Sequence, residues 1–159
     1  MTTIEITARM GTPSDVGTLV SMYRDLEAEQ AALRPIWPES QGLDEPFPES
    51  MAEIIGSPDA VVVVGTIDSC VLGFLVASIE ALRDRAEGRR VGVVRYIFTS
   101  DDARGVGIGQ AMFDFAMDEL RGRGVDLFDA IVSPGHRLAK NFFESQGFKA
   151  RLIVMNRLE

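Results

Sequence analysis

The sequence, 159 residues long, contains few of the side chains that form disulfides and metal sites. It has a single cysteine, Cys70, and a single histidine, His136. An intramolecular disulfide and a His-rich metal site are therefore excluded, and we expect no metal. The cysteine usage does not require an oxidising compartment, and the first ten residues lack the apolar region of a secretory signal. The longest apolar runs, such as Val61–Val64, are too short to span a bilayer, so we expect a cytoplasmic protein.

Basic residues are scarce in the first third of the chain. Residues 1–60 contain 11 acidic and 3 basic residues, whereas residues 61–159 contain 13 of each, so the net charge of −8 arises before residue 61. This distribution argues against nucleic acid and anionic membranes as main partners, because both require a basic face. The acidic third is compatible with a cationic small-molecule or peptide partner. The alternative is a solvated acidic face without a partner.

Periodicity and turn residues predict a single α/β (α+β) domain over residues 1–159. The composition, 46% hydrophobic and 25% charged, is that of a globular protein of one-domain size. The predicted order is β-α-α-β-β-β-α-β-α-β, and the sheet is mixed because hairpins force antiparallel pairs whereas helical crossovers allow parallel ones. The predicted strands cover residues 4–7, 61–67, 71–79, 91–99, 127–132 and 151–158. The predicted helices cover residues 13–33, 49–55, 107–121 and 137–145.

Two segments near the N-terminus carry local signals. The segment 12–15 (TPSD) predicts a helix start, with Thr12 as the N-cap and Asp15 completing a capping-box-like exchange. Residues 34–48 contain four prolines and one glycine, which predicts a loop of a length that is often functional. The only tryptophan, Trp37, lies in this loop, where it either packs the loop or contacts substrate.

The segment 104–110, RGVGIGQ, predicts an anion site. It lies between a predicted strand and an amphipathic helix, and its three glycines alternate where the helix begins. Glycine allows positive φ and close approach of a ligand, and free N–H groups at a helix N-terminus bind anions. Arg104 adds a fixed positive charge, so we expect a phosphate or pyrophosphate cradle. The P-loop and dinucleotide-binding patterns are excluded, because no Lys-Ser or Lys-Thr follows and the glycine spacing is G-x-G-x-G.

The same segment fits the pattern R-x-x-G-x-G through Arg104, Gly107 and Gly109, and it resembles the acetyl-CoA pyrophosphate loop of the GNAT superfamily of N-acetyltransferases. A second segment, residues 136–148 (HRLAKNFFESQGF), resembles that family's C-terminal pattern N-x-x-A-x-x-F-Y-E-x-x-G-F. The matching residues are Ala139, Phe142, Glu144, Gly147 and Phe148. The element order also resembles the family over nearly the whole chain. The alternative is a glycine turn followed by an ordinary helix end.

The resemblance implies that the strands at 91–99 and 127–132 splay apart and leave a V-shaped cleft for the pantetheine arm of acetyl-CoA. The arm would pair with strand backbone, and a bulge N–H near Phe98 would polarise the thioester carbonyl. Residues 105–110 would bind the pyrophosphate. The implied cofactor-binding residues are Ile97, Phe98, Thr99, Arg104, Gly105, Val106, Gly107, Ile108, Gly109, Gln110 and Asn141.

The chain departs from the family where many members carry acids and bases. Phe143 stands where a tyrosine acid is common, His136 where an asparagine opens the second pattern, and Ile131 where some relatives carry a glutamate. The candidates for catalytic proton transfer are Tyr96, His136 and Asp129. Each has an alternative: a packed strand aromatic for Tyr96, a capping or CoA-contacting residue for His136, and a solvent-facing strand residue for Asp129.

The resemblance implies direct attack of an amine on the thioester of acetyl-CoA, once the amine has lost a proton. We therefore expect an N-acetyltransferase that acts on a primary amine of a small molecule or peptide. In the family the first two helices shape the acceptor side, which here is Thr12–Gly56, the segment with most of the acidic excess, so we expect a cationic acceptor. The alternative is a non-catalytic acyl-CoA-binding sensor or interaction module of the same fold. A homodimer is one possible assembly, but no residue pattern specifies it.

Overall fold

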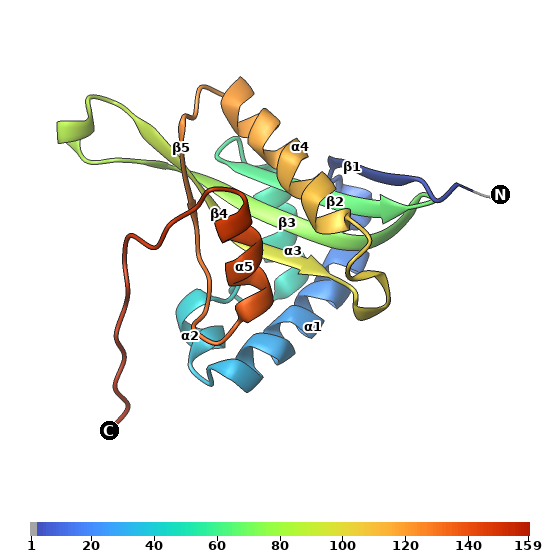
Figure 1. The fold of residues 1–159 in the computed structure, drawn as a ribbon, viewed down its shortest axis with the longest axis horizontal. Helices are drawn as coiled ribbons and strands as arrows, with labels where there is room; N and C mark the ends of the chain where they lie inside the picture. Colours follow the sequence, from blue (N-terminus) through green and yellow to red (C-terminus); the bar gives the residue numbers. More distant parts are fainter. Residues whose placement is uncertain (1–2) are drawn as a thin grey trace.

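A five-stranded sheet runs through the centre of the structure, a computed structural model that describes residues 3–159 (Figure 1). The strands follow chain order in space, β1-β2-β3-β4-β5. The first four strands pair antiparallel and β4 pairs parallel with β5, so the sheet is mixed, as predicted. The strands are β1 (Ile6–Met10), β2 (Ala60–Ile67), β3 (Cys70–Ala81), β4 (Arg90–Thr99) and β5 (Leu127–Ala130).

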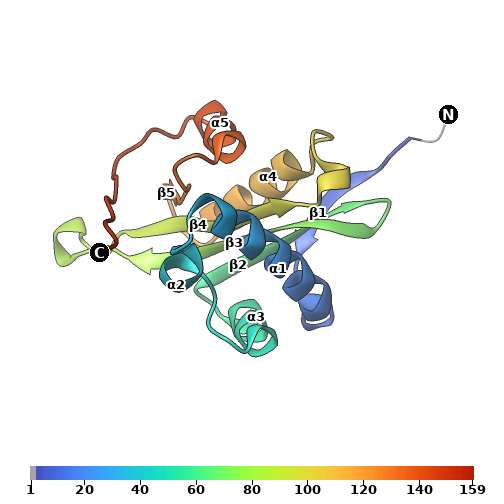
Figure 2. The ribbon, with the colours of Figure 1, turned by 90° about the horizontal axis from the view of Figure 1, so that it is seen from below.

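Helices cover both faces of this sheet, and the predicted α/β class is confirmed. Helices α1, α2 and α3 lie on one face, and α4 and α5 lie on the other (Figure 2). Each face has its own core, built around Tyr23 and Met51 on the first and Met112 and Leu120 on the second, all four fully buried. The helices are α1 (Val16–Leu33), α2 (Trp37–Gln41), α3 (Phe47–Gly56), α4 (Ile108–Gly122) and α5 (Arg137–Ser145).

The start of α1 forms as the sequence predicts. A short 3₁₀ turn, Pro13–Asp15, leads into the helix, and the Thr12 N–H donates to Asp15 Oδ2 at 2.8 Å. Asp15 also accepts two hydrogen bonds from the Arg9 guanidinium, at 2.8 and 2.9 Å. These hydrogen bonds from Arg9 are the main reason that the pKa of the Asp15 carboxyl falls to about 2. The pair therefore ties β1 to the beginning of α1.

Helix α4 lies very close to the sheet because β2 carries a glycine beneath it. A Cβ built on Gly65 would come within 2.5 Å of Ile108 Cγ2 and 2.8 Å of Met112 Cγ. Any other residue at position 65 would push the helix away from the sheet. The position of Gly65 therefore helps to fix the helix whose first turn follows the glycine-rich segment.

The proline-rich stretch 34–48 differs from the prediction, because it contains helix α2. Trp37 and Pro38 are its first two residues. Proline lacks only an N–H that would have no partner in the first turn of a helix, so it is tolerated there. Some prolines of this stretch therefore lie in the first turns of helices and others lie in the loop. Trp37 belongs to a helix.

The predicted last strand is wrong. Residues 151–158 pair with no strand, and they leave the body of the molecule in an extended course (Figure 1). Their apolar side chains are exposed, from 70% for Leu158 to 87% for Met155. A β-branched run favours extended backbone, but a strand also needs an edge to pair with, and local pattern cannot supply one.

Strands β4 and β5 separate partway along their length. The parallel ladder between them ends at the pair Val94–Ala130, whereas β4 continues beyond it. The register between β3 and β4 shifts between Val94 and Tyr96, so Arg95 is an extra, bulged residue. The bulge is thus three residues earlier than the position near Phe98 that the resemblance implies. The strands part directly after it and leave a gap between β4 and the chain that follows β5.

Candidate functional site

The segment 104–110, called the glycine loop below, has the geometry of an anion site. Gly105 and Gly107 have φ angles of +81° and +101°, which other residues rarely adopt. Helix α4 begins at Ile108, and the Ala111 N–H donates to Gly107 O at 3.0 Å. The N–H groups of the first turn before Ala111 therefore have no partner within the helix. A diphosphate fits this set of donors, because free N–H groups at a helix start bind anions.

Arg104 stands at the entrance to the glycine loop and has acidic neighbours. Its guanidinium contacts Glu29 of α1 at 3.0 Å and Asp101 at 3.2 Å, and its Nε donates to the Thr99 carbonyl at 3.0 Å. These contacts hold the positive charge between the end of β4 and α1. A phosphate at the loop would compete with two carboxylates for this guanidinium.

Two other residues of the glycine loop offer their backbone rather than their side chains. Val106 is 46% exposed. The side-chain amide of Gln110 exchanges hydrogen bonds with the amide of Gln146 and also donates to Asp114 at 2.9 Å. The backbone N–H of Gln110 is therefore the group that it can offer to an anion.

The free edge of β4 presents backbone from alternate residues. The Ser100 N–H donates to Leu72 of β3 at 2.8 Å. Because backbone groups alternate along a strand, those of Phe98 point toward β3, whereas those of Ile97 and Thr99 point toward the gap beyond β5. The hydrogen bond from Arg104 Nε to the Thr99 carbonyl confirms that the Thr99 carbonyl points away from β3. Ile97 and Thr99 are thus the residues whose backbone can pair with an extended ligand.

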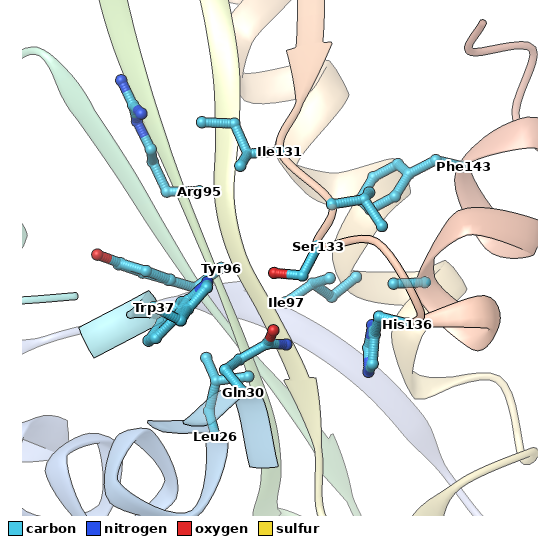
Figure 3. Close-up of a pocket in the computed structure, with 12 residues that line it drawn as sticks. Leu26, Gln30, Trp37, Arg95, Tyr96, Ile97, Ile131, Ser133, His136 and Phe143 are labelled. Carbon is cyan, nitrogen blue, oxygen red and sulfur yellow. The ribbon is translucent and has the colours of Figure 1, made fainter. Parts of the chain in front are cut away.

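A small pocket, called the splay pocket below, lies where β4 and β5 part (Figure 3). Its volume is about 30 Å³, which is room for a water molecule. An acyl group therefore fits only when the walls move apart. The pocket is lined by Leu26, Gln30, Trp37, Arg95, Tyr96, Ile97, Ile131, Val132, Ser133, His136, Ala139 and Phe143.

Tyr96 and Trp37 form an aromatic wall of the splay pocket. Their ring centroids are 6.0 Å apart in an edge-to-face arrangement, and both residues are over 90% buried. The Tyr96 hydroxyl points away from Ser133 and His136 and donates to the Gln41 carbonyl at 2.7 Å (Figure 3). Burial raises the pKa of Tyr96 to about 12. The phenol is therefore a proton donor over the whole neutral range.

His136 lies opposite this wall, just before α5. It lines the splay pocket, and its Nε2 is 3.4 Å from Glu29 Oε1. The same Glu29 carboxylate binds Arg104 through its other oxygen. Glu29 thus links the glycine loop to the pocket histidine across the mouth of the gap. Glu29 could not be identified from the sequence, because it belongs to no motif and is one of three acidic residues on α1.

Two sequence candidates lie outside the splay pocket. Asp129 of β5 is engaged with the Arg151 guanidinium, with Nε to Oδ1 at 2.7 Å, and does not line the pocket. Asn141 of α5 is exposed and is not among the lining residues. The structure therefore brings together Tyr96, His136 and Trp37, and separates Asp129 and Asn141 from them.

Gln30 is a pocket residue that the sequence analysis missed. It follows Leu19, Tyr23 and Leu26 at helical spacing, so it continues the buried stripe of α1. A polar residue in an apolar stripe is the signal that could have identified it. Its burial, at 6% exposed, matches that of its apolar neighbours on the stripe.

A second hollow, called the acidic groove below, adjoins the splay pocket on the α3 side. Its volume is about 340 Å³, and it shares Arg95 and Tyr96 with the splay pocket. Glu53 and Asp59 lie in its wall, whereas the Arg95 charge there is paired with Glu80 of β3. The groove is lined by Leu43, Glu53, Ile54, Ser57, Asp59, Ala60, Val76, Ala77, Ser78, Arg95 and Tyr96.

Residues 3–159 contain neither a metal-site cluster nor a membrane-spanning helix. No group of three or more His, Cys, Asp or Glu side chains in this range has the arrangement of a metal site. No helix in the same range combines the length and the apolar character needed to cross a membrane.

Solved structures with similar folds cover nearly the whole chain. A transcriptional regulator from Bacillus halodurans has 21% identity and a TM-score of 0.77, with 98% of this chain and 100% of that chain covered. An aminoglycoside N-acetyltransferase in complex with CoA has 14% identity and a TM-score of 0.75, with 99% and 97% covered. A predicted acetyltransferase with acetyl-CoA from Clostridium acetobutylicum has 15% identity and a TM-score of 0.70, with 96% of each chain covered. At these identities the likeness establishes the fold.

The sequence itself gives the family. No curated protein sequence matches the chain. Residues 22–148, however, match the model of the Acetyltransferase (GNAT) family, and this range includes the glycine loop, the splay pocket and α5. The chain therefore belongs to the GNAT family of acetyltransferases.

Proposed function

We propose that the protein is an N-acetyltransferase that moves an acetyl group from acetyl-CoA to a primary amine of a small molecule or peptide. One observation carries this proposal: a pocket walled by Tyr96, a strand edge with free backbone groups and a glycine loop with free first-turn N–H groups follow one another along β4 and the segment after it. Acetyl-CoA supplies the acyl group as an activated thioester. Each of the three features matches one part of such an elongated co-substrate.

The residues around the glycine loop bind and orient the co-substrate in this proposal. The first-turn N–H groups of α4 and the Arg104 guanidinium hold the diphosphate. The backbone of Ile97 and Thr99 pairs with the amide-containing arm as an added strand would. Positioning of this kind accounts for a large part of the rate of a two-substrate transfer.

Tyr96 and His136 handle protons in the proposed reaction. The phenol of Tyr96, protonated at neutral pH, donates a proton to the departing sulfur after it exchanges its bond to the Gln41 carbonyl. The imidazole of His136, held by Glu29, takes the proton that the acceptor ammonium must lose, directly or through a water. Asp129 is the weaker candidate, because its carboxylate is paired with Arg151 outside the pocket.

The acidic groove supports a cationic acceptor. It ends at Tyr96, next to the splay pocket, and carries the carboxylates of Glu53 and Asp59. A polyamine, an aminoglycoside or a Lys-rich peptide would place one amine in the pocket and its other positive charges along the groove. Carboxylates beside the path also raise the local concentration of cationic molecules.

Thiol release from acetyl-CoA, measured against a panel of amines, tests the proposal. The expected result is saturable release with polyamines, aminoglycosides or Lys-rich peptides, together with a product heavier by one acetyl group. Consistent preference for neutral or anionic amines would contradict the cationic acceptor and leave the transferase proposal in place.

A non-catalytic acyl-CoA sensor is the second candidate. The observation in its favour is that the splay pocket has no carboxylate in its wall and has Phe143 where relatives often place a tyrosine. Micromolar binding of CoA without thiol release for any amine of the panel would select the sensor. Turnover that survives Tyr96→Phe and His136→Ala together would select transfer by positioning alone.

We further propose a homodimer in which the C-terminal segment takes part. Four consecutive apolar side chains, Leu152–Met155, are more than 70% exposed, and β5 is an edge strand with one free side. Pairing of this segment with a second copy would bury them. Light scattering on the full chain and on a chain ending at residue 150 tests this: a dimer that becomes a monomer supports it, whereas equal masses contradict it.

A further inference from the structure

Gln30 carries a polar atom that the described part of the chain leaves without a partner. Its side-chain Oε1 is the one buried side-chain nitrogen or oxygen in residues 3–159 that makes no hydrogen bond. The residue is 6% exposed. A buried carbonyl oxygen without a donor destabilises the folded protein, so it is retained where a ligand or a water supplies the donor.

The position of this oxygen is inside the candidate active site. Gln30 lies beside Leu26 on the α1 side of the splay pocket, and its amide points toward Ile97 and Ser133 (Figure 3). Gln30 and Glu29 are neighbours on α1 and face different ways, as consecutive helical residues do. Glu29 faces Arg104 and His136, whereas Gln30 faces the pocket.

No protein donor in the wall of the splay pocket, the Ser133 hydroxyl and the Trp37 N–H included, donates a hydrogen bond to Gln30 Oε1, and two of the donors there are engaged elsewhere. The Tyr96 hydroxyl donates to the Gln41 carbonyl, and the Arg95 guanidinium binds Ser78 and Glu80. The cavity in front of the amide has room for about one water, which is the natural partner in the free protein. A ligand that enters the pocket must displace this water and replace its hydrogen bond.

We propose that Gln30 Oε1 accepts a hydrogen bond from the attacking nitrogen of the acceptor amine and thereby positions it beside β4. This inference rests on the proposed function, because it names the residue that binds the acceptor nitrogen in that reaction. A primary amine brings N–H donors to the pocket, and one bond to Gln30 leaves its lone pair free to attack. Gln30 is therefore a substrate-binding residue that determines specificity for a hydrogen-bond donor.

A neutral amide suits this position better than a carboxylate would. An amide oxygen accepts from both an ammonium and a neutral amine, so the nitrogen stays bound while its proton leaves toward His136. A carboxylate beside the nitrogen would favour the charged ammonium and oppose proton loss. The choice of Gln over Glu at a buried position on an otherwise acidic helix is consistent with this requirement.

Three variants test the proposal with spermidine, kanamycin and a lysine-containing peptide as probes. Gln30→Met keeps the shape and removes the acceptor, so kcat/KM for the amine should fall about ten- to hundredfold. The Kd of CoA should stay within about twofold, and the thermal midpoint should stay or rise because an unpaired polar group is gone. Ser21→Met is the matched control: it places the same side chain at an exposed position of the same helix, and we expect unchanged kinetics.

Gln30→Glu separates positioning from packing. It keeps an oxygen acceptor at the same place, so the KM of the amine should not rise. The rising limb of the kcat–pH profile should move to higher pH by about 1–3 units, because the carboxylate holds the ammonium form. A residue with only a structural role would not shift this limb.

The outcomes distinguish failure of this inference from failure of the proposed function. Unchanged kcat/KM in Gln30→Met, or a loss that appears in CoA affinity instead, overturns the role of Gln30 while leaving the transferase intact. If the unmodified protein acetylates none of the three probes, the proposed function fails for these amines. The role of Gln30 is then tested by NMR, through the side-chain amide signals of Gln30 in the CoA-saturated protein. Shifts of these NMR signals on adding the amines support the inference, and constant signals overturn it.

Discussion

The proposed co-substrate side and the proposed acceptor side of the candidate site are built by different means. The co-substrate side, formed by β4, the glycine loop and the start of α4, offers backbone groups: first-turn N–H donors and the free edges of Ile97 and Thr99. The acceptor side, formed by α1, α2 and α3, offers side chains such as Trp37, Gln30 and Glu53. A site made of backbone groups needs glycine at fixed positions, so it can be recognised in the sequence as a motif. A site made of helix side chains has no such motif, and only the pattern of buried and charged residues indicates it.

The largest effect should come from a change on the co-substrate side. Gly107→Glu places a side chain where φ is +101° and a negative charge beside the diphosphate, so the Kd of CoA should rise at least about a hundredfold. Titration calorimetry measures it. Gly122→Glu adds the same side chain at the other end of α4, where φ is ordinary and space is open, and should leave the Kd unchanged. A Kd within threefold of normal for Gly107→Glu would show that the loop does not bind CoA.

Removal of the pocket phenol should have the next largest effect. Tyr96→Phe should lower kcat about ten- to hundredfold with little change in CoA affinity, because a proton donor is lost but no binding contact is. With a pKa of about 12, the phenol should stay protonated and active to at least pH 10. Tyr23→Phe removes a neighbouring hydroxyl that lies outside the pocket and accepts from Leu43 N–H; it should keep kcat. Equal kcat for both variants and the unmodified protein would exclude Tyr96 as the acid.

Asp15→Asn should lower the stability of the whole fold and affect both sides of the site equally. The Asp15 pKa is lowered in the folded state, so its contribution is present above the unfolded pKa near 3.9 and is lost as the pH falls through about 2. The variant should lose roughly 1–2 kcal/mol of unfolding free energy at pH 7 and much less near pH 2. Urea denaturation at both pH values measures this. An equal loss at both would contradict the electrostatic origin.

Neutralising the acidic groove should affect the acceptor alone. Glu53→Gln with Asp59→Asn should raise the KM of spermidine about threefold at low salt and less at high salt, because both carboxylates are exposed. CoA affinity should not change. Glu87→Gln with Asp118→Asn removes the same charges elsewhere on the surface and serves as the control. A similar rise in KM for the control pair would mean that net charge, not the groove, attracts the acceptor.

The smallest effect should come from the carboxylate outside the pocket. Asp129→Asn should change kcat/KM less than about twofold, because the Asp129 side chain binds Arg151 and is not part of the pocket wall. Initial rates at saturating acetyl-CoA measure it. A loss of a hundredfold would make Asp129 the base and displace His136 from that role.

The sequence predicted the co-substrate side more completely than the acceptor side. The loop can be recognised from Arg104, Gly107 and Gly109, because backbone with positive φ at a helix start accepts few residue types other than glycine. The position of the bulge at Arg95 was misjudged, because a bulge depends on the register between two strands. The strand at 151–158 was wrong for the same reason, since its partner edge is a tertiary property.

The acceptor side was predicted mainly through composition. The acidic first third indicated a cationic partner, but nothing in the sequence singled out Glu29 or the wall of the acidic groove. Trp37 stands out in the sequence because it is the only tryptophan, whereas the prolines around it predict a loop where the structure has helix α2. Gln30 was recoverable from the stripe of α1, where a polar residue occupies a buried position.

A structure of the protein with CoA and an amine analogue tests most directly whether the splay pocket is where the two reactants meet. We predict the diphosphate on the N–H groups at the start of α4, the sulfur between β4 and the chain after β5 within hydrogen-bond reach of Tyr96, and the amine nitrogen on the acidic-groove side. CoA bound with its diphosphate away from the glycine loop, or with its sulfur outside the splay pocket, would contradict this assignment.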